Sequence, residues 1–415
     1  MATIRPFRAI RPLQEYAQRV AALPFDVLDR DQAWELAKDN PYSFLHVDKA
    51  EIDLDTSVSP YEKIVYNKAL ENLNKLISDG ILQQDSTAYY YIYRLIKNGR
   101  AQTGLVCCAS IDDYLNRVIK RHEFTLSEKE QDRTRHVDTL DANTGPIFLA
   151  CRPNALLTSK MDNWMELREP VYDFTAADGV VHSVWVIDDV SVINSLTQCV
   201  QIAESLYIAD GHHRTASAAK VGLKHRKEYP NYTGDEEFNY FLSVIFPSDQ
   251  LEILDYNRVV IDLNGNSTKQ FLDKLTNDFV VETYGGQGAL RPKERHIFGM
   301  YLDNRWYKLT AKPHICNYGD PESGLDVWIL QNHLLDPILN IKDPRTDKRI
   351  EFIGGEFSLD EMIEMVHSGW KVAFSLCPTS MDDFMAIADA GKVMPPKSTW
   401  FEPILLSGFF VHKLS

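Results

Sequence analysis

The chain has 415 residues, of which 44% are hydrophobic and 25% are charged, and its formal net charge at pH 7 is −15. This length suffices for two or three domains with their own cores, and the composition is that of an ordinary globular protein. The negative charge disfavours binding of nucleic acid or an anionic membrane by overall attraction, although a small anionic ligand needs only a local basic pocket.

Signals for secretion, membrane insertion or disulfide formation are missing from the sequence. Residues 1–13 lack the apolar stretch of a signal peptide, and nowhere do about eighteen apolar residues run together. The cysteines stand in apolar surroundings without C-x-x-C spacing, which favours reduced core residues over a zinc site or a disulfide framework. They are Cys107, Cys108, Cys151, Cys199, Cys316 and Cys377. We therefore expect a cytoplasmic protein.

The first half of the chain alternates helix-like and strand-like patterns. Apolar residues at helical spacing predict a helix over 61–80 that Gly80 ends. Two strand-like runs, 89–96 and 103–111, flank the dipeptide Asn98-Gly99, which is typical of a β-hairpin. Further along we expect a helix over 112–123 and a strand over 181–187.

The second half continues in the same way. Strands are expected over 238–246, 296–302, 306–309 and 372–377, and helices over 324–339 and 381–390. Mixed helices and strands with short hairpins favour an α+β protein with a mixed sheet over a doubly wound one. The expected domains are an N-terminal α+β domain over 1–150, a central segment over 151–250 and a C-terminal α+β domain over 251–415.

The most informative segment is 205–220, SLYIADGHHRTASAAK. An apolar run over 206–209 predicts the end of a buried strand, and an Ala-rich helix follows. Between them stand Asp210, Gly211, His212, His213 and Arg214. A strand that ends in glycine before a helix leaves backbone N–H groups pointing outward, and these attract anions. This site could hold phosphate and move a proton; the alternative is an N-cap aspartate with solvated basic neighbours.

A second polar segment runs from Arg121 to His136. His122 and Glu123 end the preceding predicted helix and could serve acid–base chemistry. Lys129 and Arg133 are four residues apart and share a helical face. The alternative is the solvated start of a helix, with a capping box formed by Thr125 and Glu128 or by Ser127 and Glu130.

A third segment, 394–401, presents Lys397, Ser398 and Thr399 on a loop that prolines stiffen, and these side chains are natural phosphate donors. The alternative is a surface turn anchored by Trp400 and Phe401. The N-terminal segments 5–9, 24–27 and 40–41 are interpreted as irregular backbone braced by aromatic side chains. Because P-loop and dinucleotide-binding motifs are absent, phosphate binding would depend on the histidine and arginine turn.

Several motifs in order resemble a large bacterial family of domains of unknown function, whose members include pyrophosphate-dependent L-serine kinases. The motifs are Arg-Pro-Phe-Arg-Ala at 5–9, Pro-Phe-Asp-Val at 24–27, Asn-Pro-x-Ser-Phe-Leu-His-Val at 40–47, Lys-Arg-His-Glu-x-Thr at 120–125, Lys-Glu-x-Asp-Arg at 129–133, Ala-Asp-Gly-His-His-Arg at 209–214 and Pro-Pro-Lys-Ser-Thr-Trp-Phe at 395–401. The resemblance covers nearly the whole chain.

The segment 210–214 is also similar to the signature of archaeal ADP-dependent free serine kinases, which share a fold with ParB and sulfiredoxin proteins. The resemblance implies a mixed-sheet catalytic core of the ParB/sulfiredoxin-like fold with additional α/β domains. These domains would account for the greater length of this chain.

The resemblance implies transfer of a phosphoryl group from pyrophosphate to free L-serine, giving O-phospho-L-serine and phosphate. The expected phosphate-binding residues are Gly211, His212, His213, Arg214, Lys397, Ser398, Thr399, Lys129 and Arg133. Asp210 or Glu123 would be the base, with His122 in reserve, and Asp210 and Glu123 would hold Mg²⁺. The alternatives are an ATP- or ADP-dependent kinase of a related hydroxylated metabolite, and a ParB-like nucleotide- or DNA-binding module.

Overall fold

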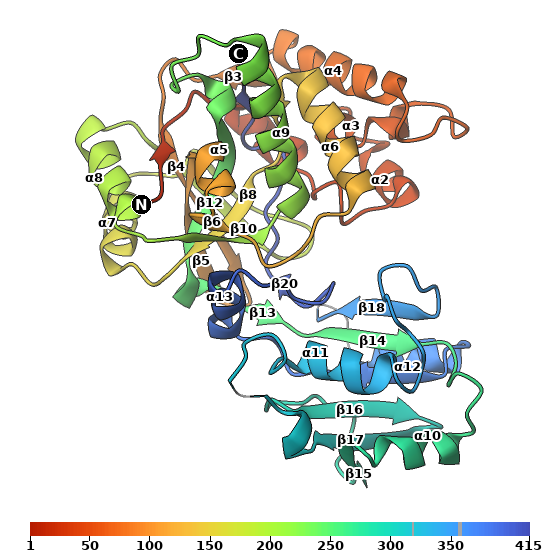
Figure 1. Ribbon diagram of the computed structural model, residues 1–415. Helices are drawn as coiled ribbons and strands as arrows, with labels where there is room; N and C mark the ends of the chain where they lie inside the picture. The colour runs from red at the N-terminus through yellow and green to blue at the C-terminus, as the bar shows by residue number, and fades with distance from the viewer. Residues whose placement is uncertain (318, 356–358) are drawn as a thin grey trace. The chain divides into compact units, whose positions relative to one another are not determined.

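The computed structural model describes residues 1–317, 319–355 and 359–415 and divides into two compact units (Figure 1). Unit 1 comprises Met1–Arg121, Thr125–Leu251 and Pro403–Ser415; unit 2 comprises His122–Phe124 and Glu252–Glu402. Among the described residues, no helix is both long enough and apolar enough to cross a membrane. The three-segment division expected from the sequence stays a prediction, because these units reflect compactness alone.

Unit 1 is built on a nine-stranded sheet in the order β6-β11-β8-β12-β5-β4-β10-β9, with β1 paired to β5. Strand β11 runs parallel to β6 and antiparallel to β8, whereas β12 runs parallel to β8 and antiparallel to β5. The expected mixed sheet is therefore confirmed. The strands are β1 (Ile4–Arg5), β4 (Tyr90–Lys97), β5 (Arg100–Ser110), β6 (Ile119–Lys120), β8 (Ile147–Cys151), β9 (Tyr172–Thr175), β10 (Val181–Ile187), β11 (Leu206–Asp210) and β12 (Tyr240–Pro247).

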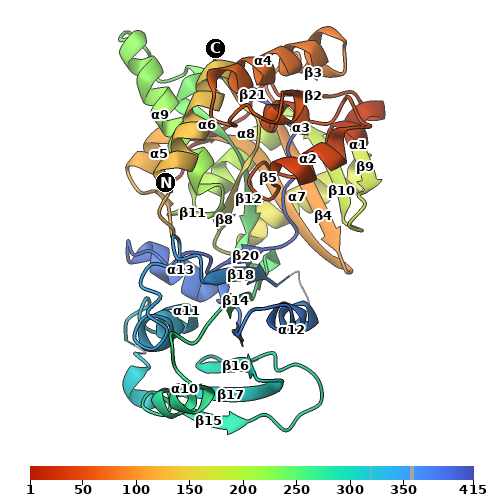
Figure 2. The same cartoon turned by 90° about the vertical axis from the view of Figure 1, so that its right-hand side faces the viewer.

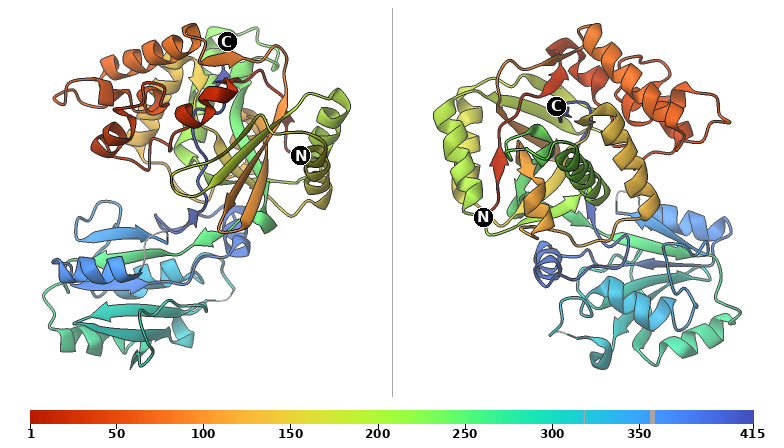
Figure 3. Two further views of the ribbon diagram at one scale, coloured as in Figure 1. Left: turned by 180° about the vertical axis from the view of Figure 1, so that it is seen from behind. Right: turned by 45° about the horizontal axis from the view of Figure 1, so that its top comes forward.

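Helices of unit 1 pack in pairs: α7 lies beside α8, and α6 lies along α9 (Figures 1 and 3). Two short pairs complete the unit, β2 (Ile10–Pro12) with β3 (Leu82–Gln84) and β7 (Ala142–Asn143) with β21 (His412–Lys413). The helices are α1 (Ala17–Val20), α2 (Arg30–Ala37), α3 (Leu45–Asp48), α4 (Lys63–Ser78), α5 (Ile111–Leu115), α6 (Ser127–Leu140), α7 (Ala155–Leu167), α8 (Val190–Gln201) and α9 (His212–Glu228).

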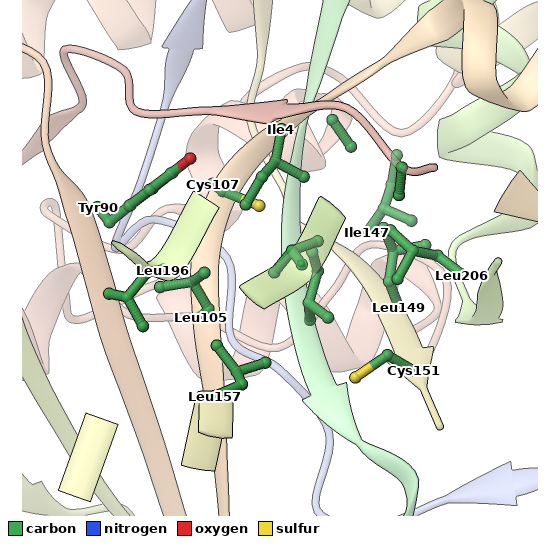
Figure 4. Close-up of a cluster of buried hydrophobic side chains, with 14 of the residues drawn as sticks. Ile4, Tyr90, Leu105, Cys107, Ile147, Leu149, Cys151, Leu157, Leu196 and Leu206 are labelled. Atoms are coloured by element: carbon green, nitrogen blue, oxygen red, sulfur yellow. The ribbon is translucent and has the colours of Figure 1, made fainter. Parts of the chain in front are cut away.

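One core of unit 1 lies between the sheet and its helices, where apolar side chains of β4, β5, β8 and β11 meet those of α7 and α8 (Figure 4). Leu105, Leu149 and Leu196 are fully buried there. Burial of this apolar surface fixes the sheet, and so fixes the end of β11 from which the predicted site begins. All six cysteines are free thiols.

Unit 2 holds a six-stranded antiparallel sheet in the order β15-β17-β16-β19-β14-β18, and α12 packs against β14 and β19 (Figure 2). Strands β13 (Ile253–Leu254) and β20 (Trp400–Phe401) form a separate pair. The other elements are β14 (Tyr256–Val260), α10 (Thr268–Leu275), β15 (Phe279–Thr283), β16 (Ile297–Leu302), β17 (Arg305–Ala311), α11 (Asp326–Leu330), β18 (Ile350–Gly354), α12 (Leu359–His367), β19 (Val372–Ser375) and α13 (Met381–Asp389).

Two expected helices differ from the structure. The helix expected over 112–123 ends at Leu115, because Arg117 adopts a left-handed conformation and residues 119–120 pair with β11 as β6. The helix expected over 324–339 is α-helical only over Asp326–Leu330 and continues as a π-helix over Gln331–Leu335. The hairpin at Asn98-Gly99 is confirmed, with Lys97 opposite Arg100.

Candidate functional site

The site begins where β11 ends at Asp210 and α9 begins at His212. Gly211 joins them with φ 93, a left-handed conformation that favours glycine, and a Cβ there would lie 3.3 Å from Arg214 Nε. No side chain caps the first turn of α9, and that turn has no acidic residue. Its N–H groups and the positive end of the helix dipole therefore suit an anion.

Arg214 is the charged group most firmly fixed at this turn. Its Nη1 donates to the Pro146 carbonyl at 2.6 Å, and its Nη2 forms an ion pair with the Asp210 carboxylate. Burial alone would lower its pKa, but Asp210, followed by Asp26 and Asp48, raises the pKa overall, so Arg214 stays charged. Nε is buried and has no hydrogen-bond partner among the described residues. Arg214 therefore keeps N–H groups for a ligand.

The two histidines play different parts in the turn. His212 is buried at the first position of α9, with 6% of its surface exposed. His213 Nε2 accepts a hydrogen bond from the Leu126 N–H at 2.9 Å. Burial, and then the positive charge of Lys129, lower the pKa of His213, although Asp26 and Glu130 act in the opposite direction. A neutral His213 therefore holds the start of α6 in place.

The residues expected on one face of α6 have different environments. Lys129 is exposed, whereas Arg133 is 9% exposed, lies 3.9 Å from the Phe25 ring and donates from Nε to Asp132 at 2.8 Å. The capping boxes considered in the alternative interpretation do not form, because Leu126 is the N-cap of α6 and makes no side-chain cap bond. Thr125 donates instead to Glu130.

Unit 1 also contains a pocket that the sequence did not predict. It is lined by Phe25, Asp48, Arg133, His136, Val137, Asn143, Thr144, Gly145, Ile147, Arg214 and Ser407. Phe25 lies in segment 24–27, which was interpreted as structural, and Asp48 directly follows the family motif at residues 40–47. The only signal in the sequence was that Phe25 and Asp48 lie within or next to motifs rich in polar and aromatic residues.

Unit 2 fixes His122 beside the Lys-Ser-Thr loop. His122 is 2% exposed, and its Nε2 lies 3.1 Å from Thr399 Oγ1. Its carbonyl accepts from the Met394 N–H at 2.8 Å, and its ring meets Phe384 edge to face. The imidazole and the hydroxyl of Thr399 are therefore held together by main-chain and aromatic contacts of the same unit.

The Lys-Ser-Thr loop is itself internally braced. Ser398 Oγ donates to the Pro395 carbonyl at 2.5 Å, and the Lys397 carbonyl accepts from buried Arg258 at 2.9 Å. Lys397 has φ 57. The Ser398 hydroxyl proton thus stabilises the turn, while Arg258 fixes the backbone of the loop.

The predicted site residues are distributed over both units. Unit 1 gathers Lys129, Arg133, Asp210, Gly211, His212, His213 and Arg214, and unit 2 gathers His122, Glu123, Lys397, Ser398 and Thr399. Their joint action on one ligand, and their roles as base, phosphate ligands and Mg²⁺ ligands, stay predictions. The carboxylate of Asp210 provides oxygen ligands, which Mg²⁺ prefers. The Asp210 side chain is 51% exposed, so an ion from solvent can reach it.

The lowered pKa of His213 gives a pH dependence with a definite sign. The unfolded imidazole, with a pKa near 6.5, binds more protons just below that pH than the folded one does. The free energy of unfolding therefore falls as the pH falls through this window. His213→Gln keeps an acceptor for the Leu126 N–H. In this variant we expect the slope of the free energy of unfolding against pH to decrease by the equivalent of up to about one bound proton. Urea unfolding between pH 5 and pH 8 measures it; equal slopes in the two proteins would contradict the interpretation.

Comparison with solved structures finds distant likenesses. Among solved structures, "Free serine kinase in complex with AMP" is 14% identical, with coverage of 75% of this chain and 87% of that chain and a TM-score of 0.36. "SbnI with C-terminal truncation from Staphylococcus aureus" is 11% identical, with coverage of 72% and 85% and a TM-score of 0.38. Likenesses this distant carry no argument about function.

No curated protein matches the sequence. Residues 4–328 match the family described as "Protein of unknown function (DUF1015)". This match covers most of the chain and confirms the resemblance inferred from the motifs. The chain therefore belongs to the DUF1015 family.

Proposed function

We propose that the protein is a small-molecule kinase that transfers a phosphoryl group from inorganic pyrophosphate to the hydroxyl of free L-serine. The observation that carries the proposal is the uncapped start of α9, where buried, charged Arg214 keeps unpaired N–H groups. Phosphoryl transfer asks a protein mainly for positioning and for stabilisation of negative charge. The turn offers both to a small anion.

In the proposed reaction, the serine hydroxyl oxygen forms a bond to one phosphorus of pyrophosphate and the bridging P–O bond breaks. The products are O-phospho-L-serine and orthophosphate. The hydroxyl proton passes to the carboxylate of Asp210 or Glu123, and His122 is a further candidate for the base. Arg214 and the first turn of α9 neutralise the donor phosphates. Lys129 is proposed to add a donor to the same anion, and the loop residues Lys397, Ser398 and Thr399 remain further candidate phosphate donors.

Asp210 and Glu123 are the proposed ligands of Mg²⁺. When bound, Mg²⁺ would neutralise charge on the donor phosphate oxygens. A single half-exposed carboxylate such as Asp210 suits this ion, which keeps several waters and takes one or two carboxylates. We also propose that the protein acts in the cytoplasm, since its free thiols suit a reducing compartment.

The donor and the acceptor are identified by ³¹P NMR of the purified protein with L-serine, Mg²⁺ and one donor at a time. We expect pyrophosphate to be consumed with equal amounts of O-phospho-L-serine and orthophosphate formed, and ADP and ATP to give no phosphoserine. Turnover with a nucleotide alone would replace pyrophosphate as the donor. Absence of phosphoserine with all three donors would overturn the proposal.

Arg214→Ala removes the charged group that the proposal places on the transferring phosphates. We expect kcat/KM to fall by about 30- to 1,000-fold, as loss of one electrostatic donor commonly costs roughly 2–4 kcal/mol. Arg226→Ala is the matched control, because Arg226 also lies on α9 and pairs with an aspartate, Asp112 at 2.8 Å. Equal kinetics in the two variants would remove Arg214 from the site.

Asp210→Asn tests the proposed base. Asparagine keeps an oxygen that can accept from Arg214, so the fold is expected to persist while turnover is abolished. Asp138→Asn serves as control, since it also neutralises a carboxylate that pairs with α9, here at Lys224. Initial rates and thermal unfolding of both variants make the comparison. An active Asp210→Asn enzyme would move the assignment of the base to Glu123.

A further inference from the structure

The pocket of unit 1 holds a buried carboxylate with few partners. Asp48 ends α3 and is 4% exposed. Its Oδ1 accepts from the Thr144 hydroxyl at 2.7 Å. No other hydrogen bond and no ion pair reaches this carboxylate from the described residues. A buried carboxylate with a single hydrogen bond lowers the free energy of unfolding. A ligand that donates further hydrogen bonds to Asp48 would offset this cost.

The other charged groups of the pocket are already neutralised by neighbours. Arg133 donates from Nε to Asp132 at 2.8 Å, and only its Nη1 reaches Asp48, at the main-chain carbonyl 3.3 Å away. Arg214 pairs with Asp210. Burial, and then Arg133, lower the pKa of His136, so this imidazole adds no charge at pH 7. The Asp48 carboxylate interacts electrostatically with Arg214, but it accepts only the Thr144 hydrogen bond and has no ion pair among the described residues, so it can accept further hydrogen bonds from a cationic group.

Donors for an anionic group border the same pocket. Arg214 has five N–H donors, of which two are paired, one with the Pro146 carbonyl and one with Asp210. A Cβ on Gly145 would lie 3.6 Å from Arg214 Nη1 and 3.1 Å from Ser407 Oγ, so glycine leaves this space open. The pocket thus offers a cation site at Asp48 and an anion site at Arg214.

We propose that this pocket binds the amino-acid end of the acceptor, with the α-ammonium group on Asp48 and the α-carboxylate on Arg214. The inference rests on the proposed function and assigns the residues that recognise the acceptor as an α-amino acid. Asp48 then disfavours hydroxy acids of the same size, because without an ammonium group its buried carboxylate gains no cationic hydrogen-bond donor. A polyphosphate would also be repelled by Asp48 and is directed to the start of α9 instead.

Isothermal titration calorimetry without a phosphoryl donor tests the pocket directly. The probes are L-serine, 3-hydroxypropionate, which lacks the amino group, and ethanolamine, which lacks the carboxylate. We expect the wild-type protein to bind L-serine at least about tenfold more tightly than either analogue, as loss of a charge-assisted hydrogen bond predicts. In Asp48→Asn, the preference for L-serine over 3-hydroxypropionate should disappear.

Two controls separate recognition from folding. Asp53→Asn neutralises a carboxylate just beyond α3 that is fully engaged by His46 and Asn72, and it should leave L-serine binding unchanged. Asp48→Asn should unfold at the same urea concentration as the wild type or a higher one, because it removes a buried charge that has a single hydrogen bond and no ion pair among the described residues. If Asp48→Asn does not fold, Gly145→Ala replaces it as the test. The added methyl group narrows the pocket, so this variant must bind L-serine more weakly than the wild type.

The outcomes distinguish this inference from the proposed function. L-serine binding that is unchanged in Asp48→Asn or in Gly145→Ala overturns the pocket assignment, even if the protein makes phosphoserine. Loss of L-serine binding in those variants supports it, even if no donor gives phosphoserine with the wild-type protein. Equal affinity of the wild type for L-serine and 3-hydroxypropionate also overturns it.

Discussion

The ion pair between Arg214 and Asp210 is the interaction on which the site depends. A buried guanidinium is tolerated only when its charge is paired and its N–H groups are hydrogen-bonded. Here the Asp210 carboxylate pairs with the charge of Arg214, and the Pro146 carbonyl accepts one of its N–H groups. Because Asp210 ends β11 and Arg214 lies in the first turn of α9, the pair fixes the angle at which the helix leaves the strand. Gly211 makes that angle possible, since its backbone adopts a left-handed conformation with Arg214 Nε close by.

Unit 1 thus places two kinds of electrostatic environment side by side. The start of α9 carries positive potential from the helix dipole and from Arg214, which suits phosphate. The pocket behind it is dominated by Asp48, because Arg133 is neutralised by Asp132 and His136 is uncharged at pH 7. Arg214 borders both environments. The positive start of α9 suits a phosphoryl group, and the negative Asp48 suits an α-ammonium group. A ligand that carries one of these groups at each end therefore fits both environments.

Local sequence predicted the elements whose causes are local. An apolar run, an Asp-Gly dipeptide and an Ala-rich segment sufficed for β11, the turn and α9, and Asn98-Gly99 sufficed for the hairpin. The helix expected over 112–123 failed because tertiary pairing with β11 recruits residues 119–120 into the sheet. Periodicity in the sequence does not carry that information.

The pocket was missed for a related reason. Asp48 meets the hydroxyl of Thr144, and the Asp48 carbonyl meets Arg133, so each contact spans more than eighty residues of chain. Only the folded sheet and α6 bring these groups together. The neighbouring segments 24–27 and 40–41 were interpreted as irregular backbone braced by aromatic side chains, because nothing local shows which residues face a pocket.

The most direct test of the account is a crystal structure of the protein with O-phospho-L-serine bound. We predict that the phosphoryl oxygens accept hydrogen bonds from N–H groups in the first turn of α9 and from Arg214, that the α-carboxylate also accepts from Arg214, and that the α-ammonium group contacts the Asp48 carboxylate. A complex in which the ligand is bound with both Arg214 and Asp48 untouched would contradict the account.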